Sequence, residues 1–216
     1  MKAGRIIMIV GNGGIPAGSG ALIDAADVVI RFNDCRSIGA GGTKTDIVAV
    51  CNTGRPARAM LDGDGWTASE GVRQAREIWS VRDSEKFAEM RPELARTHPD
   101  LDDFCDDYTA GFERFSRETR RMHRVIPAAV HEQVDRDLAR FAPEPYVVPS
   151  SGMIVIADVL AGFAGRNDDV VLAGFDHVGW EWHPFAAERQ LVGVLAAEGR
   201  LRRLSSLPSA DLLEEA

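Results

Sequence analysis

The chain has 216 residues, of which 45% are hydrophobic and 27% are charged, and its formal net charge is -8. This length allows a single domain over residues 1–216 whose core needs no disulfide or metal to fold. The acidic balance argues against a nucleic-acid partner, because a duplex-binding surface must be basic. Cysteine use is sparse and odd in number, which is typical of a reducing compartment. We therefore expect a cytoplasmic protein, and its apolar runs are too short to span a membrane.

The first half of the chain alternates apolar strands with turns. Residues 6–10 form a continuous apolar run, typical of a central strand covered on both faces. A short helix is expected over residues 19–26 and a glycine-rich loop over residues 38–44. Four strands are expected in this half, at residues 6–10, 28–33, 46–51 and 77–81.

The second half begins with a segment rich in Arg, Glu and Asp, residues 84–141, which predicts a helical insert. Prolines are expected to break it, at Pro92, Pro99 and Pro127. A long apolar helix, a strand and a last helix follow, at residues 152–165, 169–175 and 184–198, and the acidic end at 211–216 is expected to fray. Strands that alternate with helices predict an α/β fold with a three-layer, mostly parallel sheet.

A glycine-rich turn, residues 11–20, links the first strand to the first helix. Such a turn can hold a phosphate, since glycines allow close backbone approach and the helix start offers free N–H groups. A dinucleotide site is disfavoured, because Pro16 interrupts the glycine pattern and Arg31 lies where an acid would bind a ribose. Residues 39–45 resemble a P-loop only in part, since they lead into a strand. The alternative that the glycines only make a tight turn stays open.

A second anion-binding turn is expected at residues 149–152, where Ser151 and Gly152 begin the apolar helix. The alternative is that Ser151 simply caps this helix. Residues 174–184 then follow a strand end, where open α/β sheets bind ligands. Pro184 as first helical residue would make His183 the N-cap, so that the helix dipole lowers its pKa and keeps a neutral general base. The alternative is a histidine packed between Trp182 and Phe185.

Taken together, these segments resemble the sialyltransferases of glycosyltransferase family 29. The resemblance covers about residues 5–55 and 147–190. The large sialylmotif matches Gly11-Asn12, Ile23-Asp24, Arg31-x-Asn33 and Gly42-x-Lys44-Thr45. The small motif matches Pro149-Ser150-Ser151-Gly152 with Gly174-Phe175, the third motif places His177, and the very small motif matches His183-x4-Glu188.

The resemblance implies a Rossmann-like, GT-A-variant fold and transfer of a sugar from a CMP-activated donor to a glycan or small-molecule acceptor. It implies an inverting reaction without metal or cofactor, with His183 as the general base. His177 would support the departing phosphate and Glu188 would organise its helix or the loop. The donor-binding residues implied are Gly11, Asn12, Gly13, Asn33, Ser150, Ser151 and Gly152.

The chain also departs from the family pattern. Gly13-Gly14 stands where Ser-Gly is usual, and Val178-Gly179 replaces an aromatic pair after His177. Small bacterial proteins of this kind are also called urease operon accessory proteins, and a non-catalytic nucleotide-binding protein is one alternative. A sugar-nucleotide hydrolase is another. Asp62-Gly63-Asp64 resembles a metal-binding DxD motif, but we interpret it as a solvated turn.

Overall fold

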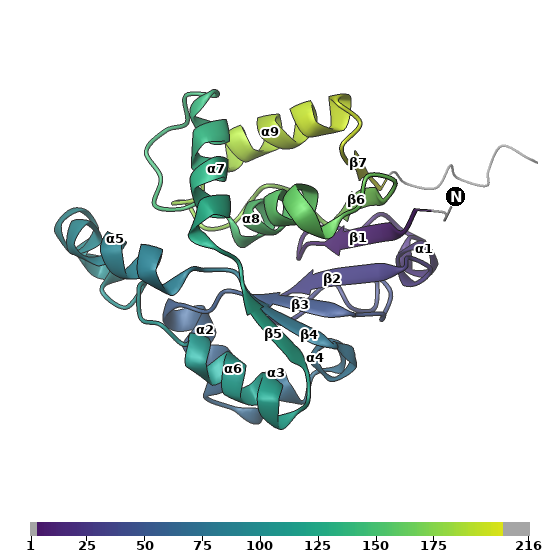
Figure 1. Ribbon diagram of the computed structural model, residues 1–216, viewed down its shortest axis with the longest axis horizontal. Helices are drawn as coiled ribbons and strands as arrows, with labels where there is room; N and C mark the ends of the chain where they lie inside the picture. Colours follow the sequence, from purple (N-terminus) through teal and green to yellow (C-terminus); the bar gives the residue numbers. More distant parts are fainter. Residues whose placement is uncertain (1–3, 205–216) are drawn as a thin grey trace, which may run out of the picture.

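The computed structural model describes residues 4–204. In this part of the chain seven strands form one sheet in the order β5-β4-β3-β2-β1-β6-β7, and every neighbouring pair is parallel (Figure 1). The predicted α/β fold with a parallel sheet is confirmed. The strands are β1 (Ile6–Val10), β2 (Val28–Phe32), β3 (Ile47–Val50), β4 (Glu77–Ser80), β5 (Met122–Val125), β6 (Asp169–Ala173) and β7 (Arg202–Arg203). The acidic end at 211–216 lies outside the described residues.

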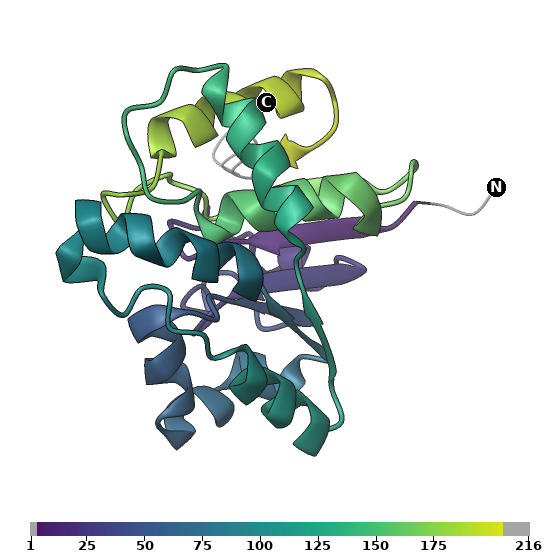
Figure 2. The same cartoon turned by 60° about the vertical axis from the view of Figure 1, so that its left-hand side comes forward.

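Helices cover both faces of the sheet, which makes the predicted three layers (Figure 2). The helices on one face are α7 (Ala128–Ala139), α8 (Ser151–Asp158), continued by the π-helical turn η2 (Val159–Phe163), and α9 (Phe185–Ala197). The helices on the other face are α1 (Gly20–Asp24), α2 (Gly54–Leu61), α3 (Asp64–Thr67), α4 (Glu70–Gln74) and α6 (Thr109–Glu118). The segments beside the carboxyl ends of the strands are α5 (Ser84–Thr97) and η1 (Pro99–Leu101). Among residues 4–204, no helix has the length and apolar character that crossing a bilayer requires.

The central strands are apolar along their whole length because both of their faces are covered. In β1, Ile7 and Ile9 pack under α8 and α9, whereas Met8 and Val10 pack against α1 on the opposite face. All four of these side chains are buried. The apolar run that predicted a central strand therefore reflects two separate cores, one on each side of the sheet.

The helical prediction for residues 84–141 was wrong at two places. Residues 122–125 form the edge strand β5, which pairs with β4 through its backbone and leaves Met122 exposed. Only one side of an edge strand is paired, so it lacks the apolar pattern that marks a central strand. Pro92 lies inside α5 instead of ending it. Pro92 is on the exposed side, where water can bond the carbonyl that lost its partner.

β1 lies between β2 and β6 in the sheet. From β1 the strands that follow in sequence are added first on one side, as β2 to β5, and then on the other, as β6 and β7. Connections diverge at such a point, so a crevice forms at the carboxyl ends of the strands. The backbone after β1 lies directly against the backbone after β6: Gly11 N–H donates to the Ala173 carbonyl at 2.8 Å. A Cβ atom added to Gly11 would lie 2.3 Å from the carbonyl oxygen of Gly174. Gly11 is therefore required by close contact between two loops.

We predict that Gly11→Ala destabilises the fold by about 1–3 kcal/mol, because the added methyl group meets backbone that cannot move aside. Gly193→Ala is the matched control. Gly193 is an exposed residue of α9, and an added Cβ would meet nothing within 4 Å. This control should stabilise the protein by about 0.5–1 kcal/mol, the usual gain from glycine to alanine in a helix. Chemical denaturation of both variants measures the difference, and equal stabilities would contradict the close contact.

Candidate functional site

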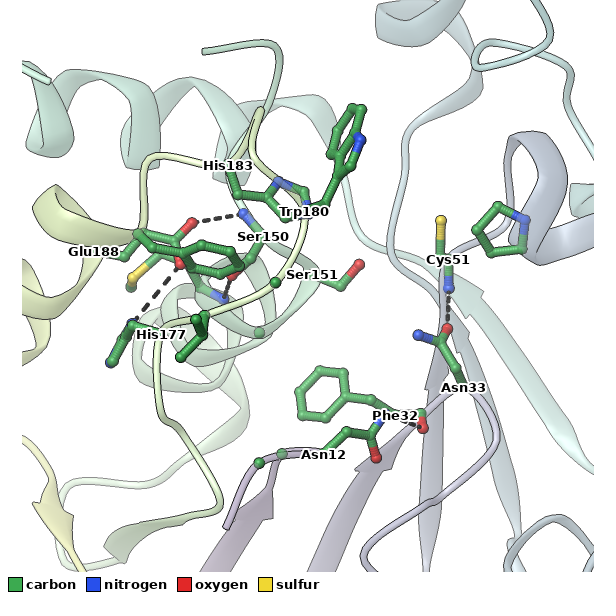
Figure 3. A pocket seen from close by; sticks show the side chains of 18 of the residues that line it. Asn12, Phe32, Asn33, Cys51, Ser150, Ser151, His177, Trp180, His183 and Glu188 are labelled. Carbon is green, nitrogen blue, oxygen red and sulfur yellow. Dashed lines mark hydrogen bonds and ion pairs between the residues drawn. The ribbon is translucent and has the colours of Figure 1, made fainter. Parts of the chain in front are cut away.

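One cavity of about 790 Å³ opens at the carboxyl ends of the strands (Figure 3). It lies at the point where the strand order reverses, as expected for a ligand site in an open α/β sheet. All the site residues that the sequence predicted contribute to its lining. They are Gly11, Asn12, Gly13, Asn33, Ser150, Ser151, Gly152, His177, His183 and Glu188. Residues from the two ends of the chain thus share one cavity, but their individual roles differ from the expectations.

The first three glycines of the turn after β1 do not offer free N–H groups, since Gly11 N–H already donates to the Ala173 carbonyl. Gly13 N–H donates to the Gly174 carbonyl at 2.9 Å, and Gly14 N–H donates to Asp176 Oδ2 at 2.7 Å. A Cβ on Gly13 would lie 2.6 Å from the same carboxylate oxygen. These glycines therefore bring two loops together, and their amides already have acceptors. This corrects the expectation that Gly11 and Gly13 form a phosphate cradle and favours the tight-turn alternative.

Asn12 is the polar side chain that this turn presents to the cavity. Its Nδ2 donates to the Phe32 carbonyl at 3.4 Å. Its Oδ1 is buried and has no hydrogen-bond partner among residues 4–204. A buried acceptor without a donor costs free energy, so native proteins rarely leave one unsatisfied. Asn12 Oδ1 is therefore an unsatisfied acceptor in a residue that lines the cavity.

Asn33 follows β2 and has a backbone φ of 50°. Non-glycine residues at positive φ carry strain and are concentrated at functional sites. Asn33 Oδ1 accepts from Cys51 N–H at 2.8 Å, and its own carbonyl accepts from Trp66 Nε1 at 2.8 Å. These bonds turn Nδ2 toward the cavity, as Figure 3 shows. Nδ2 is therefore a positioned donor.

The second turn, before α8, leaves backbone donors free. The N-cap is Ser150, whose side chain accepts from Met153 N–H at 3.1 Å, so the expectation that Ser151 caps the helix was wrong by one residue. The amides of Ser151 and Gly152 belong to the first turn and have no partner within the helix. The Ser151 side chain points into the cavity toward Asn33 (Figure 3). This end of α8 can bind an anion.

Glu188, in the first turn of α9, holds this second turn in place. It is 1% exposed and accepts from both groups of Ser150: from N–H at 2.6 Å and from the hydroxyl at 2.7 Å. Burial raises the pKa of Glu188, and the two bonds from Ser150 oppose that effect. Glu188 therefore acts on the cavity through Ser150, which donates one hydrogen bond to each of its carboxylate oxygens.

His177 is bonded to a protein group through one of its nitrogens and faces a carboxylate with the other. Arg203 Nη2 donates to Nε2 at 2.8 Å, so the ring proton is on Nδ1, which lies 4.0 Å from Glu188 Oε2. Burial lowers the pKa of His177 to about 4, and the charges of Arg203 and Arg189 act in the same direction. The ring is therefore neutral at pH 7. Its Nε2 already has a donor, so this geometry differs from the expected support of a departing phosphate.

His183 is fixed by one hydrogen bond and two aromatic rings. Its Nδ1–H donates to the Val148 carbonyl at 2.8 Å, and the rings of Trp180 and Phe185 lie 5.0 and 5.3 Å from its own. This tautomer leaves Nε2 as an unprotonated acceptor. Burial lowers the pKa of His183 to about 4, an effect that the Val148 bond opposes and the charge of Arg82 increases.

Two expectations for His183 need correction. The N-cap of α9 is Pro184, so His183 precedes the helix by one residue more than expected. Burial is the largest cause of its low pKa, in place of the helix dipole. The alternative was a histidine packed between Trp182 and Phe185. Two aromatic rings do flank His183, but they belong to Trp180 and Phe185. His183 also lines the cavity.

The wall of the cavity beside His183 also contains residues that the sequence did not single out. Trp180 stacks on Phe104 with ring centres 5.4 Å apart, which joins the loop before α9 to the segment after η1. The guanidinium of Arg82 lies over the ring of Phe104 and donates a hydrogen bond to the Thr53 hydroxyl. Arg82 and Thr53 follow the ends of β4 and β3, so their position after a strand was a usable signal. Nothing in the sequence marked Phe104.

Asp62 and Gly63 form the turn between α2 and α3, Asp64 is the first residue of α3, and none of the three lines the cavity. Among residues 4–204, no group of three His, Cys, Asp or Glu side chains is placed to hold a metal ion. The three cysteines are buried and free.

Known proteins similar to this chain were compared with it. Glycosyltransferase family 29 (sialyltransferase) matches residues 5–178. The chain is 68% identical over 212 residues, 98% of each protein, to the urease operon 23 kDa accessory protein of Rhizobium meliloti (strain 1021).

Two solved structures are similar in fold. One is a mammalian sialyltransferase in complex with Gal-beta-1-3GalNAc-ortho-nitrophenol (TM-score 0.52, 17% identity), for which the similarity covers 94% of this chain and 70% of that one. The other is the sialyltransferase CstII from Campylobacter jejuni with CMP-3FNeuAc (TM-score 0.53, 12% identity), covering 96% and 82%. The fold is therefore Rossmann-like, as the resemblance implied. The family match spans most of the chain and includes the middle segment that the motifs alone did not cover. The chain therefore belongs to glycosyltransferase family 29, the sialyltransferases.

Proposed function

We propose that this protein binds a CMP-activated sugar and transfers the sugar to an acceptor hydroxyl, with His183 as general base. One observation carries the proposal: a single cavity gathers the free ligand-binding groups around His183. These groups are Asn12 Oδ1, Asn33 Nδ2 and the first amides of α8. Family membership and the fold support the reaction class.

The free groups suit the parts of a nucleotide. The amides of Ser151 and Gly152 and the Asn33 Nδ2 are donors, so we assign them to the phosphate. Asn12 Oδ1 is an acceptor, so we assign it to a ribose hydroxyl or the cytosine amino group. As the sugar–phosphate bond breaks, charge develops on the phosphate, and the fixed dipoles at the start of α8 stabilise it without a metal ion.

His183 is suited to take the proton of the acceptor. Its Nδ1–H is held by the Val148 carbonyl, so Nε2 is the basic atom. In a single displacement with inversion, the acceptor oxygen attacks the anomeric carbon, its proton moves to Nε2, and CMP leaves. We assign His177 and Glu188 to positioning, because both are bonded to protein groups that shape the cavity.

A second candidate is a non-catalytic accessory protein that retains the nucleotide cavity. The similar protein from Rhizobium meliloti is named as a urease operon accessory protein. The family match ends at residue 178, before His183 and Glu188. This candidate predicts CMP binding without turnover. A sugar-nucleotide hydrolase would instead release CMP without an acceptor. The absence of a metal or cofactor and the cytoplasmic location stay predictions.

We predict that CMP stabilises the protein and that Asn33→Asp abolishes the effect. At a hundredfold excess over its Kd, CMP should stabilise the fold by about 2.7 kcal/mol. Aspartate keeps the acceptor for Cys51 N–H but replaces the Nδ2 donor with a negative charge beside the phosphate. Thermal shift with CMP, ATP and NAD measures this. Asn167→Asp, an exposed site far from the cavity, is the matched control and should respond to CMP like the native protein.

We predict that His183→Asn lowers the rate of CMP release about 10²–10⁴-fold, the usual contribution of a general base, and leaves CMP binding unchanged. Asparagine can still donate to the Val148 carbonyl but has no basic nitrogen. The assay uses CMP-sialic acid with a panel of acceptors. His123→Asn, on β5 and outside the cavity, is the control. Binding of CMP without release by the native protein, with every acceptor, would favour the accessory protein.

We predict that kcat/KM for this reaction stays level as the pH falls from 8 to about 5. The reaction needs neutral His183, and burial lowers the pKa of His183 to about 4 in the free protein. Activity is thus lost only as the pH falls through that value, well below the 6.5 of an ordinary histidine. A pH profile of kcat/KM reports the groups of the free enzyme. A decline that begins near pH 6.5 would contradict the burial of His183.

A further inference from the structure

Arg82 follows β4 and lies in the wall of the cavity. It is 7% exposed, and its Nη1 donates to the Thr53 hydroxyl at 2.6 Å. Its guanidinium lies over the ring of Phe104 at 4.4 Å and over the ring of Phe87 at 5.0 Å. Two rings and one hydroxyl therefore fix a buried cation at a defined position.

In the part of the chain that the structure describes, no carboxylate neutralises this cation. The other arginines of the cavity wall, Arg36 and Arg55, bond to Asp34 at 2.9 Å and Asp103 at 2.8 Å. Among residues 4–204, no carboxylate lies within the 4.0 Å that defines an ion pair with Arg82. Aromatic faces and a hydroxyl replace only part of the hydration that a buried guanidinium loses. The arrangement is explained if the counter-ion is supplied by a ligand.

Arg82 lies on the side of the cavity that the nucleotide does not need. The groups assigned to the nucleotide come from β1, β2 and the start of α8, whereas Arg82 follows β4, separated from β1 by β2 and β3 in the sheet. Arg82 is also near enough to His183 for its charge to act on that imidazole. The ring of Phe104 lies between its guanidinium and Trp180, which is adjacent to His183. Arg82 thus shares its side of the cavity with the proposed base.

We propose that Arg82 binds a carboxylate or phosphate group of the acceptor, so that the acceptor of this protein is an anionic sugar. This inference rests on the proposed function, because it assigns the other half of the cavity to the nucleotide. A guanidinium fits either anion with two parallel hydrogen bonds. Thr53 occupies Nη1, which leaves the remaining nitrogens of Arg82 for the anion.

The test compares sugars that differ only in the anion, in the presence of saturating CMP. The probes are methyl β-D-glucuronide, methyl β-D-glucoside 6-phosphate and the neutral methyl β-D-glucoside, and calorimetry measures their affinities. A charge-assisted pair with a buried arginine should make at least one anionic probe about tenfold or more tighter than the neutral one. The two anionic probes distinguish a carboxylate from a phosphate. Equal affinities for all three probes would overturn the proposal.

Arg82→Gln should remove the preference for the anionic probe and leave the affinity for CMP unchanged. Arg91→Gln, an exposed arginine outside the cavity, loses the same charge and should keep the preference. If Arg82→Gln weakens CMP instead, Arg82 belongs to the donor half and the proposal is wrong. If Arg82→Gln does not fold, Arg82→Lys, which retains the positive charge, tests whether the preference for the anionic probe depends on the side chain at this position.

Failure of CMP to bind the native protein would contradict the proposed function alone. The same probes titrated without CMP would still measure whether the cavity prefers an anion and whether Arg82 is responsible. The two failures are therefore distinguishable.

Discussion

The cavity depends on how closely the backbone after β1 approaches the backbone after β6. Three N–H groups of the turn after β1 donate to acceptors at the end of β6 and in the loop that follows it. The donors are on Gly11, Gly13 and Gly14, and there is no room for a Cβ on Gly11. This contact fixes the floor of the cavity between two strands that are distant in sequence. Because the amides of Gly11, Gly13 and Gly14 are used here, the two amides at the start of α8 are the backbone donors that we assign to an anion.

A second set of contacts holds that helix start. Arg203 donates to His177, His177 faces Glu188, and Glu188 accepts both donors of Ser150, the N-cap of α8. Glu188 is buried and both donors of Ser150 depend on it, so loss of its carboxylate would leave them unsatisfied at a cost of about 1–3 kcal/mol. The residues of three separate motifs thus act as one unit. This unit fixes the position of the two free amides at the start of α8, those of Ser151 and Gly152.

Much of the fold could be predicted because central strands and glycine turns have strong local signals. The apolar runs at 6–10, 28–33 and 169–175 gave strands within two residues of their observed ends. β5 could not be predicted, because an edge strand is held by backbone pairing and needs no apolar pattern. The site residues were found as a group by the order of the motifs. Their roles were not, because a sequence does not show which donor meets which acceptor.

The large sialylmotif illustrates that difference. Arg31 and Asn33 are two residues apart in the motif match, and of the two only Asn33 was expected to bind the donor. Arg31 is 0% exposed and donates to the carbonyls of Lys44 and Gly41 and to the hydroxyls of Thr45 and Ser37. It therefore fixes the glycine-rich loop from within the protein. Asn33 directly follows the last residue of β2, and its side chain faces the cavity. Only the three-dimensional arrangement separates a residue that supports the site from one that contacts a ligand.

The environment of His183 imposes a condition on any catalytic role. Burial and the nearby charge of Arg82 keep the imidazole neutral but also make it a weak base, since they lower its pKa to about 4. A strong proton acceptor at neutral pH needs a higher pKa. An anion bound at Arg82, or the phosphate at the start of α8, would favour the imidazolium and raise that pKa. The base would therefore gain strength only when the cavity is occupied, which couples proton transfer to the presence of both substrates.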